Sequence, residues 1–169
     1  MENQELLRKI SNELESSRSI ADFSGNQGRL FTIDIDQKTY LIKSANIDNW
    51  WSKSINKWSI KHEYRVYKKL KGLNGIPKCY GLTDRGELVL EYIDGGSYRD
   101  KQFELDGNHY FFDALLELIT SMHNLGVTHG DLKRKDNLIV DQNLKPYLID
   151  FGTAVIHDDQ SGTFKKIGF

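Results

Sequence analysis

The sequence predicts an α+β fold in which a strand-rich first part is followed by a mainly helical second part. Three observations predict it. Short apolar runs typical of paired strands occupy residues 30–43 and 78–92. A long stretch with helical apolar spacing covers residues 109–125. Gly95 and Gly96 lie between these parts and predict a break in the chain, so that a hinge separates them.

In the first part, Leu6, Leu7, Ile10 and Leu14 recur at helical spacing and predict an amphipathic helix over residues 3–16. A second helix is expected over residues 59–71, because Gly72 and Gly75 follow it and Pro77 prevents it from resuming. Four runs of β-branched, aromatic and leucine residues predict the strands, at residues 30–35, 39–43, 78–82 and 87–92.

In the second part, residues 109–125 predict a long buried helix that Gly126 ends. The apolar runs at residues 138–140 and 147–149 predict two short strands around a turn at residues 141–143. The expected order is therefore strand, strand, helix, strand, strand, hinge, helix, loop and hairpin.

Composition restricts the classes of function. The chain of 169 residues can bury a core, and its net charge of −1 gives no signal for nucleic-acid binding. A single cysteine, Cys79, excludes an internal disulfide and fits a reducing compartment, so we expect a cytoplasmic protein. No run approaches the ~20 apolar residues that a membrane-spanning helix needs, and residues 1–19 lack the apolar stretch of a signal peptide.

Two short motifs carry the chemistry. Residues 129–133 read His-Gly-Asp-Leu-Lys, with Asn137 after them, and residues 150–152 read Asp-Phe-Gly. Together they supply a carboxylate that can orient a hydroxyl group, a cation for a phosphate, and oxygen ligands for Mg²⁺. Phosphoryl transfer from a nucleotide needs this equipment, because its catalysis is mostly positioning and charge neutralisation.

The motifs and the order of elements resemble the protein-kinase-like superfamily over roughly residues 20–155. The resemblance implies a two-lobed fold. Residues 1–93 would form an antiparallel-sheet N-lobe with one αC-type helix, and residues 94–169 a minimal helical C-lobe. Because seventeen residues follow Gly152, the chain looks like the small atypical kinases with a reduced C-terminal lobe, such as RIO-type kinases or bacterial lipopolysaccharide-core sugar kinases.

The resemblance implies two catalytic residues and two metal ligands. Asp131 would accept or orient the proton of the attacking hydroxyl, and Lys133 would neutralise the migrating phosphoryl group. Asp150 would bridge Mg²⁺ to the phosphates of ATP. The family asparagine lies five positions after the aspartate, where this chain has Asp136. We favour Asn137 as the ligand, with a one-residue insertion in the loop, and Asp136 stays open as the alternative.

The resemblance also implies the residues that bind the nucleotide. Gly25 and Gly28 occupy the place of the glycine-rich loop, although Phe23 replaces its first glycine, and an ordinary hairpin turn is the alternative. Lys43 would hold the α- and β-phosphates and pair with Glu63 on the helix over residues 59–71. The last two implied contacts are backbone groups that would receive adenine, the carbonyl of Glu91 and the amide of Ile93, although a plain core strand fits these residues equally well.

Two further positions distinguish this chain. His129 is expected to be structural, hydrogen-bonding its loop. Gly130 replaces an arginine that reads a phosphorylated activation loop in regulated kinases, which predicts a kinase that is not switched in this way. A third feature, the tryptophans Trp50, Trp51 and Trp58 among lysines, is typical of indoles packed on a neighbouring helix, with peripheral membrane contact or a nucleic-acid platform as alternatives.

The function implied by the resemblance is an ATP- and Mg²⁺-dependent phosphotransferase, directed to serine or threonine and using Asp131. The acceptor hydroxyl could belong to a protein or to a small molecule, so a sugar or lipopolysaccharide-core kinase is the alternative enzyme. A pseudokinase that binds nucleotide or a partner is the alternative from another class.

Overall fold

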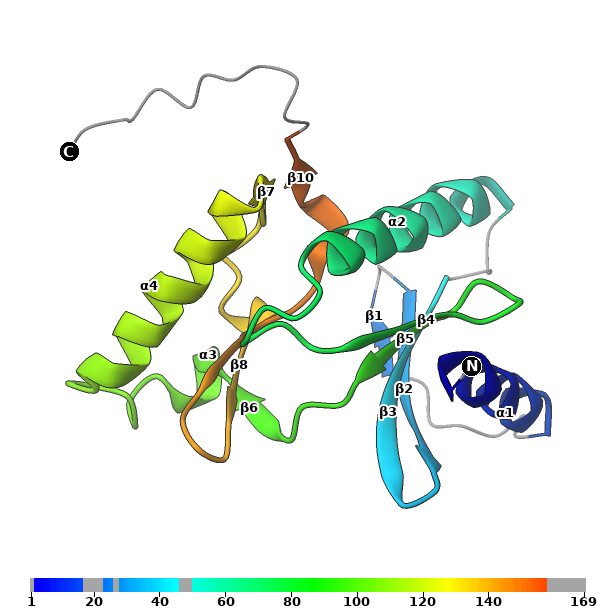
Figure 1. Cartoon of the computed structure of the whole chain (residues 1–169), viewed down its shortest axis with the longest axis horizontal. Coiled ribbons are helices and arrows are strands. Elements are labelled where there is room, and N and C mark those ends of the chain that lie inside the picture. The colour runs from blue at the N-terminus through cyan, green and yellow to red at the C-terminus, as the bar shows by residue number, and fades with distance from the viewer. Residues whose placement is uncertain (1, 17–22, 26–27, 46–49, 158–169) are drawn as a thin grey trace.

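The computed structural model describes residues 2–16, 23–25, 28–45 and 50–157, and Figure 1 shows how the elements are arranged. The first part of the described chain contains a five-stranded antiparallel sheet with strand order β1-β2-β3-β5-β4. Its strands are β1 (Phe23–Gly25), β2 (Gly28–Ile35), β3 (Lys38–Ser44), β4 (Cys79–Leu82) and β5 (Leu88–Glu91). The four predicted strands are therefore present, and β1 is added to them.

The hairpin between β2 and β3 turns through two residues, because Ile35 pairs with Lys38. Asp36 and Gln37 both have positive φ, of 50° and 61°. Two consecutive residues with positive φ are what the tight type I′ hairpin turn requires, and this turn matches the twist of the strands that it joins.

Helix α2 (Trp50–Lys69) begins nine residues before the predicted start at residue 59. Tryptophan, serine and asparagine, which fill its first turns, are weak helix formers and give little periodic signal. Because only the later turns have regular apolar spacing, the sequence predicted only the second half of this helix. Its end is close to the prediction.

Helix α1 (Glu2–Ser16) covers one face of the sheet, as Figure 1 shows beside β2 and β4. Ile10 is fully buried in a cluster that it forms with side chains from four strands: Ile33, Tyr40, Ile42, Tyr80 and Val89. Two exposed ion pairs add to the contact, Lys9 with Asp36 at 2.8 Å and Arg85 with Glu15 at 2.7 Å. The predicted amphipathic helix is therefore a cap on the outer face of the sheet.

The second part contains helix α4 and two small antiparallel sheets. Its elements are β6 (Gly95–Ser97), α3 (Tyr98–Lys101), α4 (His109–Asn124), β7 (Val127–Thr128), the 3₁₀ turn η1 (Lys135–Asn137), β8 (Leu138–Asp141), β9 (Pro146–Leu148), the 3₁₀ turn η2 (Phe151–Thr153) and β10 (Val155–Ile156). Strand order is β6-β8-β9 in one sheet, and β10 pairs with β7 in the other. The predicted helix and hairpin are present.

The prediction of a chain break at Gly95 and Gly96 was wrong, because both residues belong to β6 and pair with β8. A Cβ atom on Gly95 would lie 2.3 Å from the carbonyl oxygen of Val140. Glycine is therefore required here for close approach of two backbones, which is a common reason for glycine inside a strand.

The larger hydrophobic cluster connects the two parts of the described chain. It joins Val66 and Tyr67 of α2, and Leu70 just after this helix, to α4, β8, β9 and Phe151. The division into lobes at residue 93 stays a prediction, because this core contains side chains from both sides of that residue. None of the described helices is both long enough and apolar enough to cross a membrane.

Replacement of Ile10 by alanine tests the docking of α1 on the sheet. The side chain is fully buried, so Ile10→Ala should lower the free energy of unfolding by about 2–4 kcal/mol in urea denaturation. Leu116→Ala on α4 is the matched control, because Leu116 is 65% exposed and its removal should change stability by less than about 0.5 kcal/mol. Equal effects of the two substitutions would contradict the packing of α1.

Candidate active site

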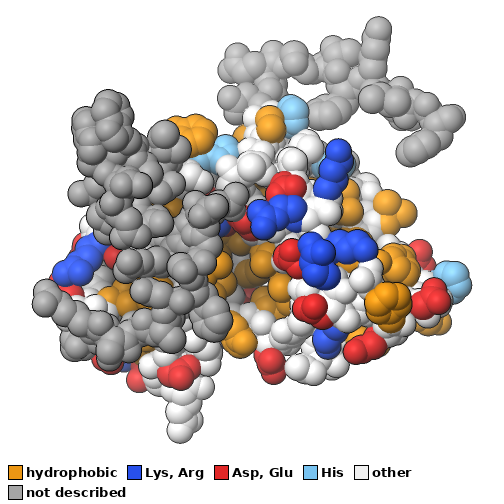
Figure 2. All heavy atoms as spheres, turned by 180° about the vertical axis from the view of Figure 1, so that it is seen from behind, with side chains coloured by type: hydrophobic (Ala, Val, Ile, Leu, Met, Phe, Trp, Pro, Cys, Tyr) orange, Lys and Arg blue, Asp and Glu red, His pale blue; other side chains and the backbone are white. Residues whose placement is uncertain are grey.

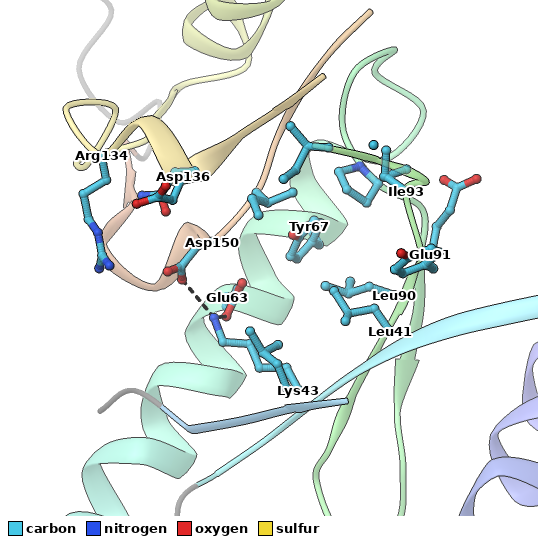
Figure 3. A pocket seen from close by; sticks show the side chains of 17 residues that line it. Leu41, Lys43, Glu63, Tyr67, Leu90, Glu91, Ile93, Arg134, Asp136 and Asp150 are labelled. Carbon is cyan, nitrogen blue, oxygen red and sulfur yellow. Dashed lines mark hydrogen bonds and ion pairs between the residues drawn. The ribbon is translucent and has the colours of Figure 1, made fainter. Parts of the chain in front are cut away.

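A cavity of about 760 Å³ lies beneath the five-stranded sheet, where β3 and β5 face α2 and the loops of the second part. This volume is in the range of small-ligand sites. One end is apolar and includes Leu30, Leu41, Leu90 and Ile93. The other end is ionic and includes Lys43, Glu63, Arg134, Asp136, Asn137 and Asp150. Figure 3 shows these two kinds of side chain at opposite sides of the same hollow.

Lys43, Glu63 and Asp150 meet at the ionic end although they are far apart in sequence. The Lys43 ammonium lies 2.7 Å from Glu63 Oε2 and 2.8 Å from Asp150 Oδ1 (Figure 3). Strand β3 presents Lys43 and α2 presents Glu63, while Asp150 directly precedes η2, which packs on α2. Their side chains are 12%, 1% and 28% exposed. The three charges therefore form one largely buried cluster.

Burial and mutual attraction set the protonation of this cluster. Burial acts to lower the pKa of Lys43, but the carboxylates of Glu63 and Asp150 outweigh it and the net shift is upward. Burial likewise opposes ionisation of Asp150, and the ammonium of Lys43 overcomes it to hold the pKa of Asp150 below its ordinary value. Burial raises the pKa of Glu63, and Lys43 partly offsets this rise. The Lys43 ammonium thus favours the ionised form of both acids, and burial opposes it most strongly at Glu63.

The turn after Asp150 brings an aromatic ring under α2. Asp150 itself adopts the left-handed conformation, with φ of 62° and ψ of 70°, which aspartate tolerates better than most residues. The left-handed turn is thus at Asp150, two residues before Gly152. Phe151 is fully buried, with ring centroids 5.1 Å from Tyr67 and 4.8 Å from His129. These contacts fix Asp150 against α2, where Glu63 lies one helical turn from Tyr67.

Hydrogen bonds from two buried side chains hold the loop over residues 129–137. His129 donates from Nε2 to the Ile149 carbonyl at 2.9 Å and accepts at Nδ1 from the Asp131 amide at 3.4 Å. Asn137 donates from Nδ2 to the carbonyl of Asp131 at 2.9 Å and to its carboxylate at 3.4 Å. The structural role expected for His129 agrees with these contacts. Asp131 is not among the lining residues of the described chain, but it contacts the lining residue Asn137.

Asp136 and Asn137 both line the cavity, but their surroundings differ. The carboxylate of Asp136 accepts two hydrogen bonds from the Arg99 guanidinium, at 2.8 and 3.0 Å, and this contact lowers the pKa of Asp136. Asn137 is buried, and its two side-chain hydrogen bonds within the described residues use the amide nitrogen, so its Oδ1 oxygen stays available as an acceptor. These contacts favour Asn137 over Asp136 as the partner of Asp150.

The donor set of Asn137 and Asp150 fits a hard divalent cation, because carboxylate and amide oxygens are the ligands that Mg²⁺ prefers. Within the described residues, no group of three or more His, Cys, Asp or Glu side chains could hold a metal by itself. A pair of protein oxygens is what Mg²⁺ needs when substrate phosphates supply further ligands. The site therefore fits a metal ion that arrives with a nucleotide.

The two residues expected to contact adenine lie together on the apolar side of the cavity. Glu91 and Ile93 both line it, at the end of β5 and just after it. The Glu91 side chain turns back along the sheet, where its Oε2 accepts from the Lys78 amide at 3.0 Å. The backbone after β5 is therefore next to the apolar pocket, as the predicted adenine contacts require.

The glycines expected to cover the phosphates lie in a hairpin. Gly25 of β1 pairs with Gly28 of β2, and the two residues between them fall outside the described residues. Leu30, further along β2, lines the cavity. Closure of this hairpin over a phosphate stays a prediction.

The loop cation was predicted at Lys133, but the structure brings a different cation to the cavity. Lys133 is exposed and is not among the lining residues of the described chain, whereas Arg134 is. The extra residue between Asp131 and Asn137 shifts the positions between them relative to the family pattern. Sequence reasoning also missed Tyr67, for which a signal existed, because it lies one helical turn after Glu63 and on the same helix face.

Trp58 does not pack on a neighbouring helix, so that prediction was wrong for this residue. It is 64% exposed and stacks on His62 of the same helix, with ring centroids 5.3 Å apart. The Nε2 atom of His62 lies 2.7 Å from the carbonyl oxygen of Ala154, so the helix and the segment after η2 are joined at this point. The side chains of Trp50 and Trp51 lie outside the described residues.

Gly130 lies where two backbone segments approach closely. Its φ is +83°, and a Cβ atom would lie 2.3 Å from the carbonyl oxygen of Thr153. The strand pair β7–β10 continues this contact, because Val155 pairs with Thr128 and Ile156 with Val127. An arginine cannot occupy this position in the observed backbone. The segment after Asp150 is thus joined to the loop before Asp131 by direct backbone packing.

Comparison with known proteins agrees with the site geometry. A sequence profile of the family described as "Protein kinase domain" matches residues 24–167. The chain is 27% identical over 147 residues to the serine/threonine-protein kinase PKH1 of Saccharomyces cerevisiae, which covers 82% of this chain and 18% of that protein. It is 30% identical over 132 residues to the serine/threonine-protein kinase chk1 of Schizosaccharomyces pombe, covering 72% of this chain and 26% of that protein.

A third relative is the probable serine/threonine-protein kinase fnkB of Dictyostelium discoideum, 32% identical over 114 residues, or 61% of this chain and 20% of that protein. The chain thus spans about a quarter or less of the length of these curated relatives.

Substitution of Gly130 tests the close backbone contact. Gly130→Ala should lower the free energy of unfolding by about 2–4 kcal/mol, because backbone strain and overlap with the Thr153 carbonyl add together. Gly86→Ala is the matched control, since Gly86 has φ of +88° and nothing within 4 Å of a Cβ, so backbone strain alone should cost about 1–2 kcal/mol. Chemical denaturation measures both variants. A smaller loss for Gly130→Ala than for Gly86→Ala would contradict the contact.

The depressed pKa of Asp150 makes its contribution to stability depend on pH. A carboxyl group whose pKa is lower in the folded state stabilises the fold above its ordinary pKa, and this contribution is lost as the pH falls through the folded value. Wild type should therefore be more stable than Asp150→Asn by about 1–2 kcal/mol at pH 7. The difference should shrink below the ordinary pKa of 3.8. Urea unfolding from pH 3 to pH 7 measures it, and a constant difference would contradict the ion pair.

Proposed function

The chain belongs to the protein kinase family, and we propose that it is an ATP- and Mg²⁺-dependent kinase that phosphorylates serine or threonine hydroxyl groups. The acceptor is proposed to be a protein, in keeping with the kinases to which the chain is similar. The single observation that carries the proposal is the Lys43–Glu63–Asp150 cluster at the ionic end of a cavity whose other end is apolar.

The cavity suits a nucleotide because its two ends differ in chemistry. A flat base can lie between Leu30, Leu41 and Leu90, beside the backbone of residues 91–93. A triphosphate that extends from this base reaches Lys43, which is held in place from both sides by carboxylates. Positioning and charge neutralisation at this end are the main work of a phosphoryl-transfer catalyst.

Asp131 is the proposed catalytic base. The carboxylate of Asp131 accepts a hydrogen bond at 3.4 Å from Asn137, which lines the cavity, and the Asp131 amide is held by His129. In the proposed reaction the acceptor oxygen forms a bond to the γ-phosphorus, and the bond between this phosphorus and the β,γ-bridging oxygen breaks. The electron pair of the broken bond stays on the ADP oxygen, and the acceptor proton passes to Asp131.

Asn137 and Asp150 are the proposed metal-holding residues, through an amide oxygen and a carboxylate oxygen. When bound, Mg²⁺ would neutralise charge that develops on the phosphate oxygens. Asp136 is the weaker candidate, because Arg99 occupies its carboxylate. The RIO-type or bacterial character of the chain and its cytoplasmic location stay predictions, the second resting on a single cysteine.

A pseudokinase that binds nucleotide without turnover is the second candidate. One observation favours it, namely the position of Lys133 outside the cavity lining of the described chain. The complete Lys43–Glu63–Asp150 cluster favours an enzyme. Binding and transfer must therefore be measured separately.

The test uses Asp131→Ala. Wild type should transfer ³²P from [γ-³²P]ATP to dephosphorylated casein, myelin basic protein or itself in the presence of Mg²⁺, and the variant should lose at least about 100-fold of this rate, because it lacks the base. Both proteins should be stabilised by ATP in a thermal-shift assay, because Asp131 is not needed for binding. Asp113→Ala is the control, since Asp113 is exposed on α4. Stabilisation by ATP without transfer in wild type would instead support the pseudokinase.

A further inference from the structure

The residues that line the ionic end of the cavity include three carboxylates and two cations, and Arg99 of α3 pairs with one of the carboxylates from outside the lining. The carboxylates are Glu63, Asp136 and Asp150, and the cations of the lining are Lys43 and Arg134. A nucleotide triphosphate adds a charge of about −4, and a single Mg²⁺ cancels only half of it. A cation with no carboxylate partner would therefore favour the transferring phosphate most strongly.

Lys43 is not such a cation. Its ammonium already contacts both Glu63 and Asp150 at less than 3 Å, and its side chain is 12% exposed. Two carboxylates around one ammonium leave a local excess of negative charge. Lys43 can orient phosphates in this arrangement, but it has little positive charge left to neutralise the group that moves.

Arg134 is differently placed. It lines the cavity and its side chain is exposed. Within the described residues no hydrogen bond or ion pair involves it, although its charge helps to lower the pKa of Asp136. Asp136, two residues away, is the nearest carboxylate along the loop, but it is held by the two hydrogen bonds from Arg99 of α3. Figure 3 shows Arg134 at the same end of the cavity as Asp136 and Asp150, away from Leu41 and Leu90.

The neighbouring lysines of the loop are less suitable. Lys133 is exposed but does not line the cavity within the described chain. Lys135 is held at 2.5 Å by Gln102, on the side of α3. Figure 2 shows lysine and arginine side chains close to acidic ones on one face of the molecule, so a basic residue by itself is not distinctive. Arg134 differs from the other basic residues of the loop because it lines the cavity.

We infer that Arg134 is a catalytic residue that contacts the γ-phosphate of ATP and takes the role expected of Lys133. The inference rests on the proposed kinase function and deepens it. As the bond from the γ-phosphorus to the bridging oxygen breaks and the bond to the acceptor oxygen forms, the planar guanidinium donates two hydrogen bonds to oxygens of the moving phosphoryl group. Arginine suits this geometry because its donors form a fork that matches phosphate.

The first measurement is binding, and it does not depend on turnover. In isothermal titration with Mg²⁺ present, Arg134→Ala should weaken ATP binding by at least about fivefold and ADP binding by less than about twofold, because ADP lacks the γ-phosphate. Arg134→Lys should recover part of the affinity for ATP, since it keeps the charge and loses the fork. Lys135→Ala is the matched control and should change neither affinity. Equal losses for ATP and ADP in Arg134→Ala would overturn the inference.

The second measurement is single-turnover transfer from [γ-³²P]ATP to dephosphorylated casein at saturating ATP. Arg134→Ala should lower the rate about 100-fold, as expected when a preorganised donor to the transition state is removed. Lys133→Ala should lower this transfer rate by less than about tenfold. The reverse order, with Lys133→Ala the more damaging, would overturn the inference and restore Lys133 to this role.

The two failures can be told apart. If wild type transfers no phosphate, the proposed function fails, and the ATP-to-ADP affinity ratio of Arg134→Ala still decides whether Arg134 contacts the γ-phosphate. If wild type is active and Asp131→Ala is not, the proposed kinase function stands. In that case, a wild-type transfer rate and a wild-type ATP affinity in Arg134→Ala would overturn the inference about Arg134 and leave the kinase function intact. Melting temperatures without nucleotide verify that the exposed Arg134 is not needed for folding.

Discussion

The ion cluster of Lys43, Glu63 and Asp150 is the constraint on which the rest of the structure depends. Buried charges are stable only when partners and hydrogen bonds compensate for lost hydration. The cluster therefore requires that β3, α2 and the turn before η2 occupy fixed relative positions. Since β3 and α2 belong to the first part of the described chain and the turn before η2 lies near its end, one set of contacts joins the two parts around the cavity.

Apolar packing supplies the force that keeps these charges together. Tyr67 follows Glu63 by one helical turn, and Phe151 follows Asp150 directly, so the ring contact of 5.1 Å between them lies next to the ion pair. Both rings belong to the larger core, with Leu70 and Met122. Burial of this core stabilises the fold by far more than one ion pair can, because each buried side chain contributes roughly 1.5–3 kcal/mol. The site is thus precise because its residues adjoin the core.

Sequence reasoning succeeded where a local pattern determines local structure. The resemblance anticipated that Lys43, Glu63 and Asp150 surround one cavity, and the apolar period anticipated α4. It failed where a distant segment decides. Gly95 is a strand residue because it pairs with β8, where the Val140 carbonyl leaves no room for a Cβ atom. Whether Lys133 or Arg134 reaches the cavity depends on the path of an inserted residue, which no periodicity encodes.

The pair of Arg99 and Asp136 holds a second carboxylate at the cavity. Asp136 directly precedes Asn137 and lines the cavity beside the proposed metal ligands, where it could attract a cation of its own. Arg99 of α3 binds this carboxylate in two places, at 2.8 and 3.0 Å. An exposed pair of this kind contributes little to stability, so its consequence is positional. It holds Asp136 toward α3, while Asn137 contacts Asp131. The Arg134 charge also lowers the pKa of Asp136, but within the described residues the two side chains form no ion pair.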